Sequence, residues 1–144
     1  MNSKNLANLA KIGSLKAEPP AQAEFDGLLR SGRTRLNDAL NAANALESRF
    51  TLAYDAAHAL ALAALRWHGY RSDKRYLVFQ TLKHTLMIED TNWRVLDLCH
   101  NRRNRGEYEG HYELDERLVS ELITATKELL HGVEGLGPVP HADK

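Results

Sequence analysis

Apolar residues recur along most of the chain at spacings of three, four and seven, the period of an amphipathic helix. The pattern predicts helices over residues 3–15, 21–45, 47–68, 72–86, 91–105 and 113–132. No stretch alternates between apolar and polar residues as a half-buried strand does. Short connections separate the segments, so the sequence predicts an all-α fold, an antiparallel up-and-down helical bundle of four to five helices.

Segment 47–68 is the most apolar part of the chain and is rich in alanine. An alanine-rich helix lets neighbours approach closely, and an apolar surface on several sides predicts a central position. The tandem prolines Pro19 and Pro20 separate the first segment from the rest, because proline cannot continue a helix. We therefore expect a short helix and linker over 1–19, the bundle over 20–134 and a flexible Gly/Pro-rich tail over 135–144.

The charge of the chain is balanced overall but unevenly distributed. The 144 residues carry 19 basic and 19 acidic groups, which excludes a globally basic coat for nucleic acid. Residues 66–105, however, hold nine basic and four acidic groups, and residues 106–144 hold three and nine. The boundary between these two blocks falls inside the most polar stretch of the sequence. The balanced net charge therefore does not exclude a small, local phosphate site.

The cysteine content, the histidines and the apolar runs of the chain indicate its cellular location and which cofactors it could bind. Cys99 is the single cysteine, and the N-terminus lacks the pattern of a signal peptide. The longest apolar run, 59–65, is too short to span a membrane. The seven histidines form no His-x-x-x-His pair, and there is no Gly-rich phosphate loop. These features predict a soluble cytoplasmic protein without a metal site, a cofactor or a membrane partner.

The stretch 100–112 gathers the residue types that act on a phosphodiester. They are Arg102, Arg103, Asn104, Arg105, Glu107, Tyr108 and His111. Arginine presents a planar fork suited to phosphate oxygens, and histidine can move a proton near neutral pH. In the alternative interpretation these arginines form ion pairs with nearby glutamates and only join the last two helices.

The order of segments resembles the HEPN superfamily of prokaryotic helical domains. The resemblance rests on an alanine-rich helix containing Phe50–Tyr54, a Gly69–Arg71 turn, His84, and an Arg103-Asn104 pair followed by Tyr108. It covers roughly residues 25–131. The family's hallmark is an arginine, a polar residue, and a histidine four to six residues on. The resemblance implies a homodimer that brings two such motifs together as a metal-independent endoribonuclease site.

Two registers of the motif fit this sequence. Arg103 and Asn104 match the Arg–polar pair best, and Tyr108 then stands where active members often have histidine. In the other register, Arg105 leads to His111 with the expected spacing. The reference pKa of tyrosine lies about 3.5 units above that of histidine, so Tyr108 is a poor base at neutral pH.

The resemblance implies two functions. In the first, a toxin-like ribonuclease holds the scissile phosphate of RNA with Arg103 or Arg105 and moves a proton with Tyr108 or His111. In the second, the same arginines belong to an inactive module that binds a nucleotide or a protein, such as the minimal nucleotidyltransferase of a toxin–antitoxin operon. The predicted catalytic residues are Arg103, Asn104, Tyr108 and His111, and the predicted substrate-binding residues are Arg102, Arg105 and Glu107.

Three other groups of residues suggest chemistry less strongly. His58 and His84 lie on partly apolar faces, where a hydrogen-bonded core or groove histidine is expected. Asp97 and His100 are three residues apart, a spacing that permits a hydrogen bond between them. A second basic cluster surrounds the predicted turn; its members are Arg66, Arg71, Lys74 and Arg75. Two interpretations are open: an approach path for RNA or a nucleotide, and a solvated turn.

Overall fold

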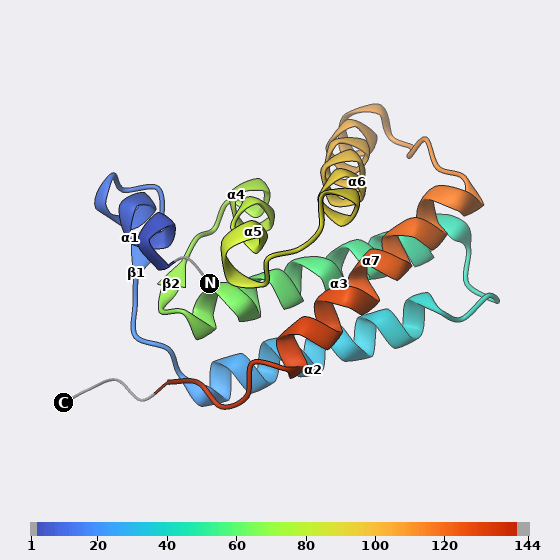
Figure 1. Ribbon diagram of the computed structural model, residues 1–144. Helices are drawn as coiled ribbons and strands as arrows, with labels where there is room; N and C mark the ends of the chain where they lie inside the picture. Colours follow the sequence, from blue (N-terminus) through green and yellow to red (C-terminus); the bar gives the residue numbers. More distant parts are fainter. Residues whose placement is uncertain (1–2, 141–144) are drawn as a thin grey trace.

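The computed structural model describes residues 3–140 and is built from helices that pack together (Figure 1). The helical segments are α1 (Ser3–Lys11), α2 (Gln22–Ala39), α3 (Leu46–Trp67), α4 (Arg75–Gln80), α5 (Leu82–Thr85), α6 (Asp90–Glu109) and α7 (Glu116–Glu134). Two short strands, β1 (Lys16–Ala17) and β2 (Tyr70–Arg71), pair antiparallel. The predicted all-α class is confirmed.

Helices α2, α3 and α7 form the body of the molecule. α2 and α3 run antiparallel, and α7 crosses in front of them (Figure 1). The alanines of α3 are buried among large apolar side chains such as Phe50, Leu60 and Leu122. At Gly32 of α2 a Cβ would lie 2.6 Å from the Leu60 side chain, so the two helices meet closely there. The predicted central position of this alanine-rich helix is confirmed.

Several predicted helix bounds are wrong, and so is the predicted absence of strands. The first helix ends at Lys11 rather than 15, and α6 extends to Glu109 rather than 105. α2 ends at Ala39 rather than 45, because polar side chains bond the loop backbone: Asn41 Oδ1 accepts from the amide of residue 43. The predicted helix over 72–86 is interrupted at Thr81, which separates α4 from α5. The β1–β2 pair, with Lys16 opposite Arg71, was not expected; strands of two residues are too short to show an alternating pattern.

A buried arginine fixes the segment that leads from α1 to α2. Arg66 is 1% exposed; its Nε donates to Glu24 Oε1 at 2.9 Å and its Nη2 to the Pro19 carbonyl at 2.7 Å. Its Nη1 donates to the Glu18 carbonyl, and Arg71 donates to the carboxylates of Glu18 and Glu24. Arg66 is therefore neither on an approach path nor in a solvated turn, the two alternatives for the basic cluster.

α1 lies on the bundle of its own chain. Leu6 is completely buried, and Asn5 Nδ2 donates to His84 Nδ1 at 3.2 Å. His84 is thus a hydrogen-bonded groove histidine, as expected. At the other end, Trp67 Nε1 donates to the Gly137 carbonyl at 3.1 Å, which holds residues 135–140 near α3. The rest of the predicted tail, 141–144, lies outside the described residues.

No helix within residues 3–140 is long and apolar enough to cross a membrane. Cys99 of α6 is buried, and burial raises the pKa of its thiol to about 12. A thiol in this state packs as a small apolar side chain rather than acting as a nucleophile.

Gly106→Ala is expected to destabilise the protein by about 1–3 kcal/mol. A Cβ at this buried position of α6 would overlap the ring of Tyr112, which packs at 5.4 Å from the ring of Phe50. The matched control is Gly27→Ala, where a Cβ meets open space. There the higher helix propensity of alanine should stabilise the fold by at most about 1 kcal/mol. Urea denaturation measures both; equal effects of the two substitutions would contradict the close contact.

Candidate functional site

The predicted site residues follow the C-terminal half of α6, which stands beside α4 and α7 (Figure 1). The structure does not gather all of them. Tyr108 is 95% exposed, and His111 lies beyond the left-handed Gly110 that ends the helix. Within residues 3–140 neither side chain makes a hydrogen bond or ion pair. A single chain therefore does not place Tyr108 or His111 against the Arg103-Asn104 pair.

Two of the three arginines join α6 to the segment before α7. Arg102 Nη1 donates to the Glu113 carbonyl at 2.6 Å, and Arg105 Nη1 lies 3.4 Å from Glu113 Oε1. These contacts match the alternative interpretation in which arginines connect the last two helices. Arg103 behaves differently, since its Nη1 pairs with Glu107 Oε1 of its own helix at 2.8 Å.

Arg103 shares an aromatic platform with a second arginine. Its guanidinium lies 5.0 Å from the ring centroid of buried Tyr54, and Arg75 of α4 lies 5.7 Å from the same centroid. Arg75 also pairs with Asp55 Oδ1 at 3.3 Å. The side chains of Arg103 and Arg75 are 26% and 37% exposed, so solvent reaches both cations. Two helices thus bring two guanidinium groups to one ring of a third.

His100 connects the platform to the motif. Its Nε2 lies 3.0 Å from Asn104 Nδ2, and its Nδ1 lies 2.9 Å from Tyr54 Oη. An amide nitrogen can only donate, so Nε2 accepts, and a neutral ring carries its hydrogen on Nδ1 and donates it to Tyr54. Burial lowers the pKa of His100, and the positive charge of nearby Arg103 lowers this pKa further. The ring is therefore neutral at pH 7 and fixes both neighbours.

Asp97 does not bond His100, although their spacing permits it. Asp97 Oδ1 instead accepts from Tyr76 Oη of α4 at 2.8 Å, and the Tyr76 ring lies 5.0 Å from the His100 ring. This tyrosine–carboxylate bond joins α4 to α6 and holds the helix that carries Arg75 at a fixed position. Tyr76 was not predicted from the sequence.

His58 is not the satisfied core histidine that was expected. Its Nε2 is buried without a hydrogen-bond partner within residues 3–140, and its ring lies 5.9 Å from that of Phe79. Burial, followed by the positive charge of Arg75, lowers the pKa of His58 to about 4. His58 is therefore a neutral group near Arg75 and Arg103 and adds no positive charge there.

Folding stability is expected to decrease as the pH falls below about 6.5. His58 titrates near 6.5 when unfolded but near 4 when folded, so its contribution is complete above pH 6.5 and is lost towards pH 4. We expect a loss of about 1–2 kcal/mol between pH 7.5 and pH 5.0 in urea denaturation. His58→Gln should flatten this dependence and His131→Gln, on an exposed residue, should not. A wild-type free energy of unfolding that is equal at both pH values would refute the prediction.

No protein-family model, curated protein or solved structure matches the chain. Within residues 3–140 no three His, Cys, Asp or Glu side chains gather as ligands for a metal ion.

Proposed function

We propose that this chain is a HEPN-like protein that binds RNA or a nucleotide through a phosphate group. The observation that carries the proposal is the convergence of Arg75 and Arg103 on the ring of Tyr54. Guanidinium groups form bidentate, charge-assisted hydrogen bonds with phosphate oxygens. Two such groups beside one ring support a local phosphate site, whereas a run of arginines along a single helix would spread its charge.

The existing ion pairs leave room for a ligand. Arg103 has one carboxylate partner, Glu107, and Arg75 has one, Asp55. Each guanidinium carries five N–H donors, and a contact with one carboxylate oxygen uses only part of them. Glu107 is exposed, so its side chain can turn away at little cost when a phosphate approaches.

The neutral His100 supports binding rather than acid–base catalysis within one chain. Both of its ring nitrogens have hydrogen-bond partners, Tyr54 and Asn104, and the ring is buried. It holds the tyrosine on which Arg103 lies and the asparagine that follows Arg103. The Arg103-Asn104 pair of the motif is thus built into a fixed scaffold, which favours the binding function.

A metal-independent endoribonuclease formed by a homodimer is the second candidate. The observation that favours it is an exposed face of α6. Leu98, Arg105 and Tyr108 lie on this face, at spacings of seven and three residues. A second copy packed on this face would place its own exposed Tyr108 beside that of the first chain, as in the pairing of two motifs that the resemblance implies. A nucleotidyltransferase partner follows from the resemblance alone and stays a prediction.

One experiment separates the two candidates. Purified wild-type protein, Arg103→Ala and His111→Ala are incubated with structured RNA in EDTA, and cleavage and binding are measured in parallel. RNA binding without cleavage that is lost only in Arg103→Ala supports the binding protein. Cleavage that disappears in both variants supports the ribonuclease. If wild-type protein neither binds nor cleaves, and Arg103→Ala only lowers the melting temperature, both are wrong.

Leu98→Asp is expected to convert the proposed homodimer to a monomer. A carboxylate at this position would be buried without a partner in the interface, which costs several kcal/mol. Leu40→Asp is the matched control, because Leu40 is 44% exposed and Leu98 42%, but Leu40 lies at the end of α2. Light scattering after size exclusion reports the mass. A wild-type monomer at all concentrations, or an unchanged dimer in Leu98→Asp, would contradict the proposal.

A further inference from the structure

A cavity of about 340 Å³ lies where the β2–α4 turn meets the loop after α1. Its walls are the loop between α1 and β1 and the turn between β2 and α4. The lining includes three cations and two hydroxyl groups: Lys16, Arg71, Lys74, Ser14 and Ser72. One carboxylate, Asp73, also lines it. The volume is within the range of small-molecule sites, about 300–1,000 Å³.

We propose that this cavity is a second phosphate subsite, so that the ligand is a single-stranded RNA bound at both positions rather than a mononucleotide. The inference rests on the proposed function, because it takes the Arg75–Arg103 pair as the first position. It gives the second basic cluster around the turn a role that the sequence left open.

The cavity is preformed by the buried Arg66 network. Arg66 holds the carbonyls of Glu18 and Pro19, and β1 pairs with β2. Both walls therefore stay in place without a ligand. Arg71 donates to the carboxylates of Glu18 and Glu24, which fixes its side chain and neutralises most of its charge. Such preorganisation reduces the entropy cost of binding.

The positive charge available to a ligand comes from the two lysines. Lys74 has no ion pair with any residue in the described range 3–140, and Lys16 has only a 3.7 Å contact with Glu18. Ser72 Oγ accepts from the Lys74 amide, so its own hydroxyl hydrogen is left to donate. Two ammonium groups and a hydroxyl donor suit the oxygens of a phosphate. They suit a nucleobase less well, because no aromatic ring lines the cavity.

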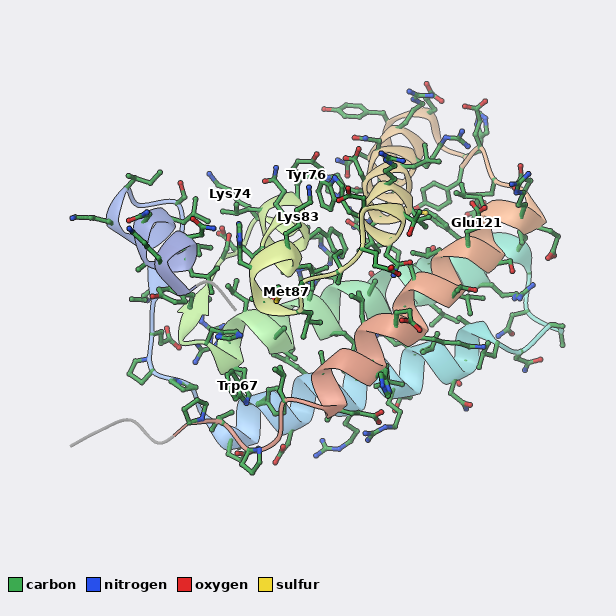
Figure 2. All side chains as sticks on the ribbon, in the orientation of Figure 1. Trp67, Lys74, Tyr76, Lys83, Met87 and Glu121 are labelled. Atoms are coloured by element: carbon green, nitrogen blue, oxygen red, sulfur yellow. The ribbon has the colours of Figure 1, made fainter. Side chains whose placement is uncertain are left out.

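Continuity along α4 connects the two positions. Lys74 and Arg75 are consecutive residues at the start of this helix; Lys74 lines the cavity and Arg75 lies over Tyr54. Figure 2 shows Lys74 on the side of α4 nearer α1 and Tyr76 on the side nearer α6, both on the same face of the molecule. A strand crossing the start of α4 would therefore place one of its phosphates at the cavity and another at the arginine pair.

The test compares a fluorescein-labelled decauridylate with uridine monophosphate. Both lysines are exposed, so Lys16→Gln/Lys74→Gln should fold like the wild type, and Lys127→Gln on the exposed surface of α7 is the control. Each lost phosphate contact lowers single-strand affinity about fivefold at 0.1 M salt and the salt slope by about 0.7. The double variant should therefore bind decauridylate about 25-fold more weakly, with a slope lower by about 1.4, and bind uridine monophosphate as the wild type does.

The outcomes distinguish this inference from the proposed function. If the double variant binds decauridylate like Lys127→Gln, the second subsite is wrong and the proposed arginine site stands. If the double variant loses both probes equally, the two lysines act on mononucleotide binding itself, and the separate second subsite is again wrong. If Arg103→Ala binds both probes like the wild type, the proposed function is wrong. Wild-type protein that binds neither probe overturns both.

Discussion

Arg103→Ala is expected to weaken binding of an oligoribonucleotide by about 10- to 100-fold. The change removes a charge-assisted hydrogen bond to phosphate, which contributes about 1.5–3 kcal/mol. The effect on folding should be small, since the Glu107 pair is exposed and the contact with Tyr54 adds about 1 kcal/mol. Fluorescence anisotropy at fixed salt measures the affinity, and a thermal melt confirms the fold.

Arg105→Ala is the matched control for this prediction. Arg105 lies on the same helix and carries the same charge, but its partner is Glu113 and it is remote from the Tyr54 platform. We expect a loss of less than about fivefold from the change in overall charge. A larger loss for Arg105→Ala than for Arg103→Ala would reverse the assignment and favour the register that joins Arg105 to His111.

Arg66→Ala is expected to have the largest effect on stability, a loss of about 3–5 kcal/mol. The substitution leaves the Glu24 carboxylate and the carbonyls of Glu18 and Pro19 without their buried donor. Urea denaturation at pH 7 gives the free energy of unfolding. Limited proteolysis should also show faster cleavage within residues 12–20, because this segment loses its main attachment.

Arg33→Ala provides the comparison for Arg66. Arg33 pairs with Glu134 at 2.8 Å, as short as a strong ion pair, but both side chains are largely exposed. An exposed pair of this kind contributes about 0–1 kcal/mol. Equal losses for the two substitutions would mean that burial of Arg66 does not stabilise the segment between α1 and α2.

Much of the fold could be predicted because helices repeat their apolar positions locally. The periodicity located the segments that became α2, α3, α6 and α7, and the alanine content identified α3 as central. The end of α2 was missed because side chains of the following loop bond its backbone, which apolar spacing does not report. The β1–β2 pair depends on two segments more than 50 residues apart, so no local pattern indicates it.

Some residues of the candidate site could be predicted from the sequence, and others could not. The Arg103-Asn104 pair was found because its residues are adjacent, and His100 is only four positions before Asn104. Arg75 was named only in the second basic cluster and Tyr54 only as part of the alanine-rich helix. Neither was linked to Arg103, because packing of α3, α4 and α6 alone brings them together. Arg66 could not be recognised as buried, since its partners come from a linker about 45 residues earlier.

The most direct test of the central claim follows the Nε–Hε signals of the arginines by nuclear magnetic resonance during titration with decauridylate. Arg75→Lys and Arg103→Lys assign the two signals of the site. If a phosphate binds between these guanidinium groups, both signals shift together with the fraction of protein bound. A complex that forms while both signals stay unchanged, with shifts only at arginines of α2 or at Arg105, would contradict the claim.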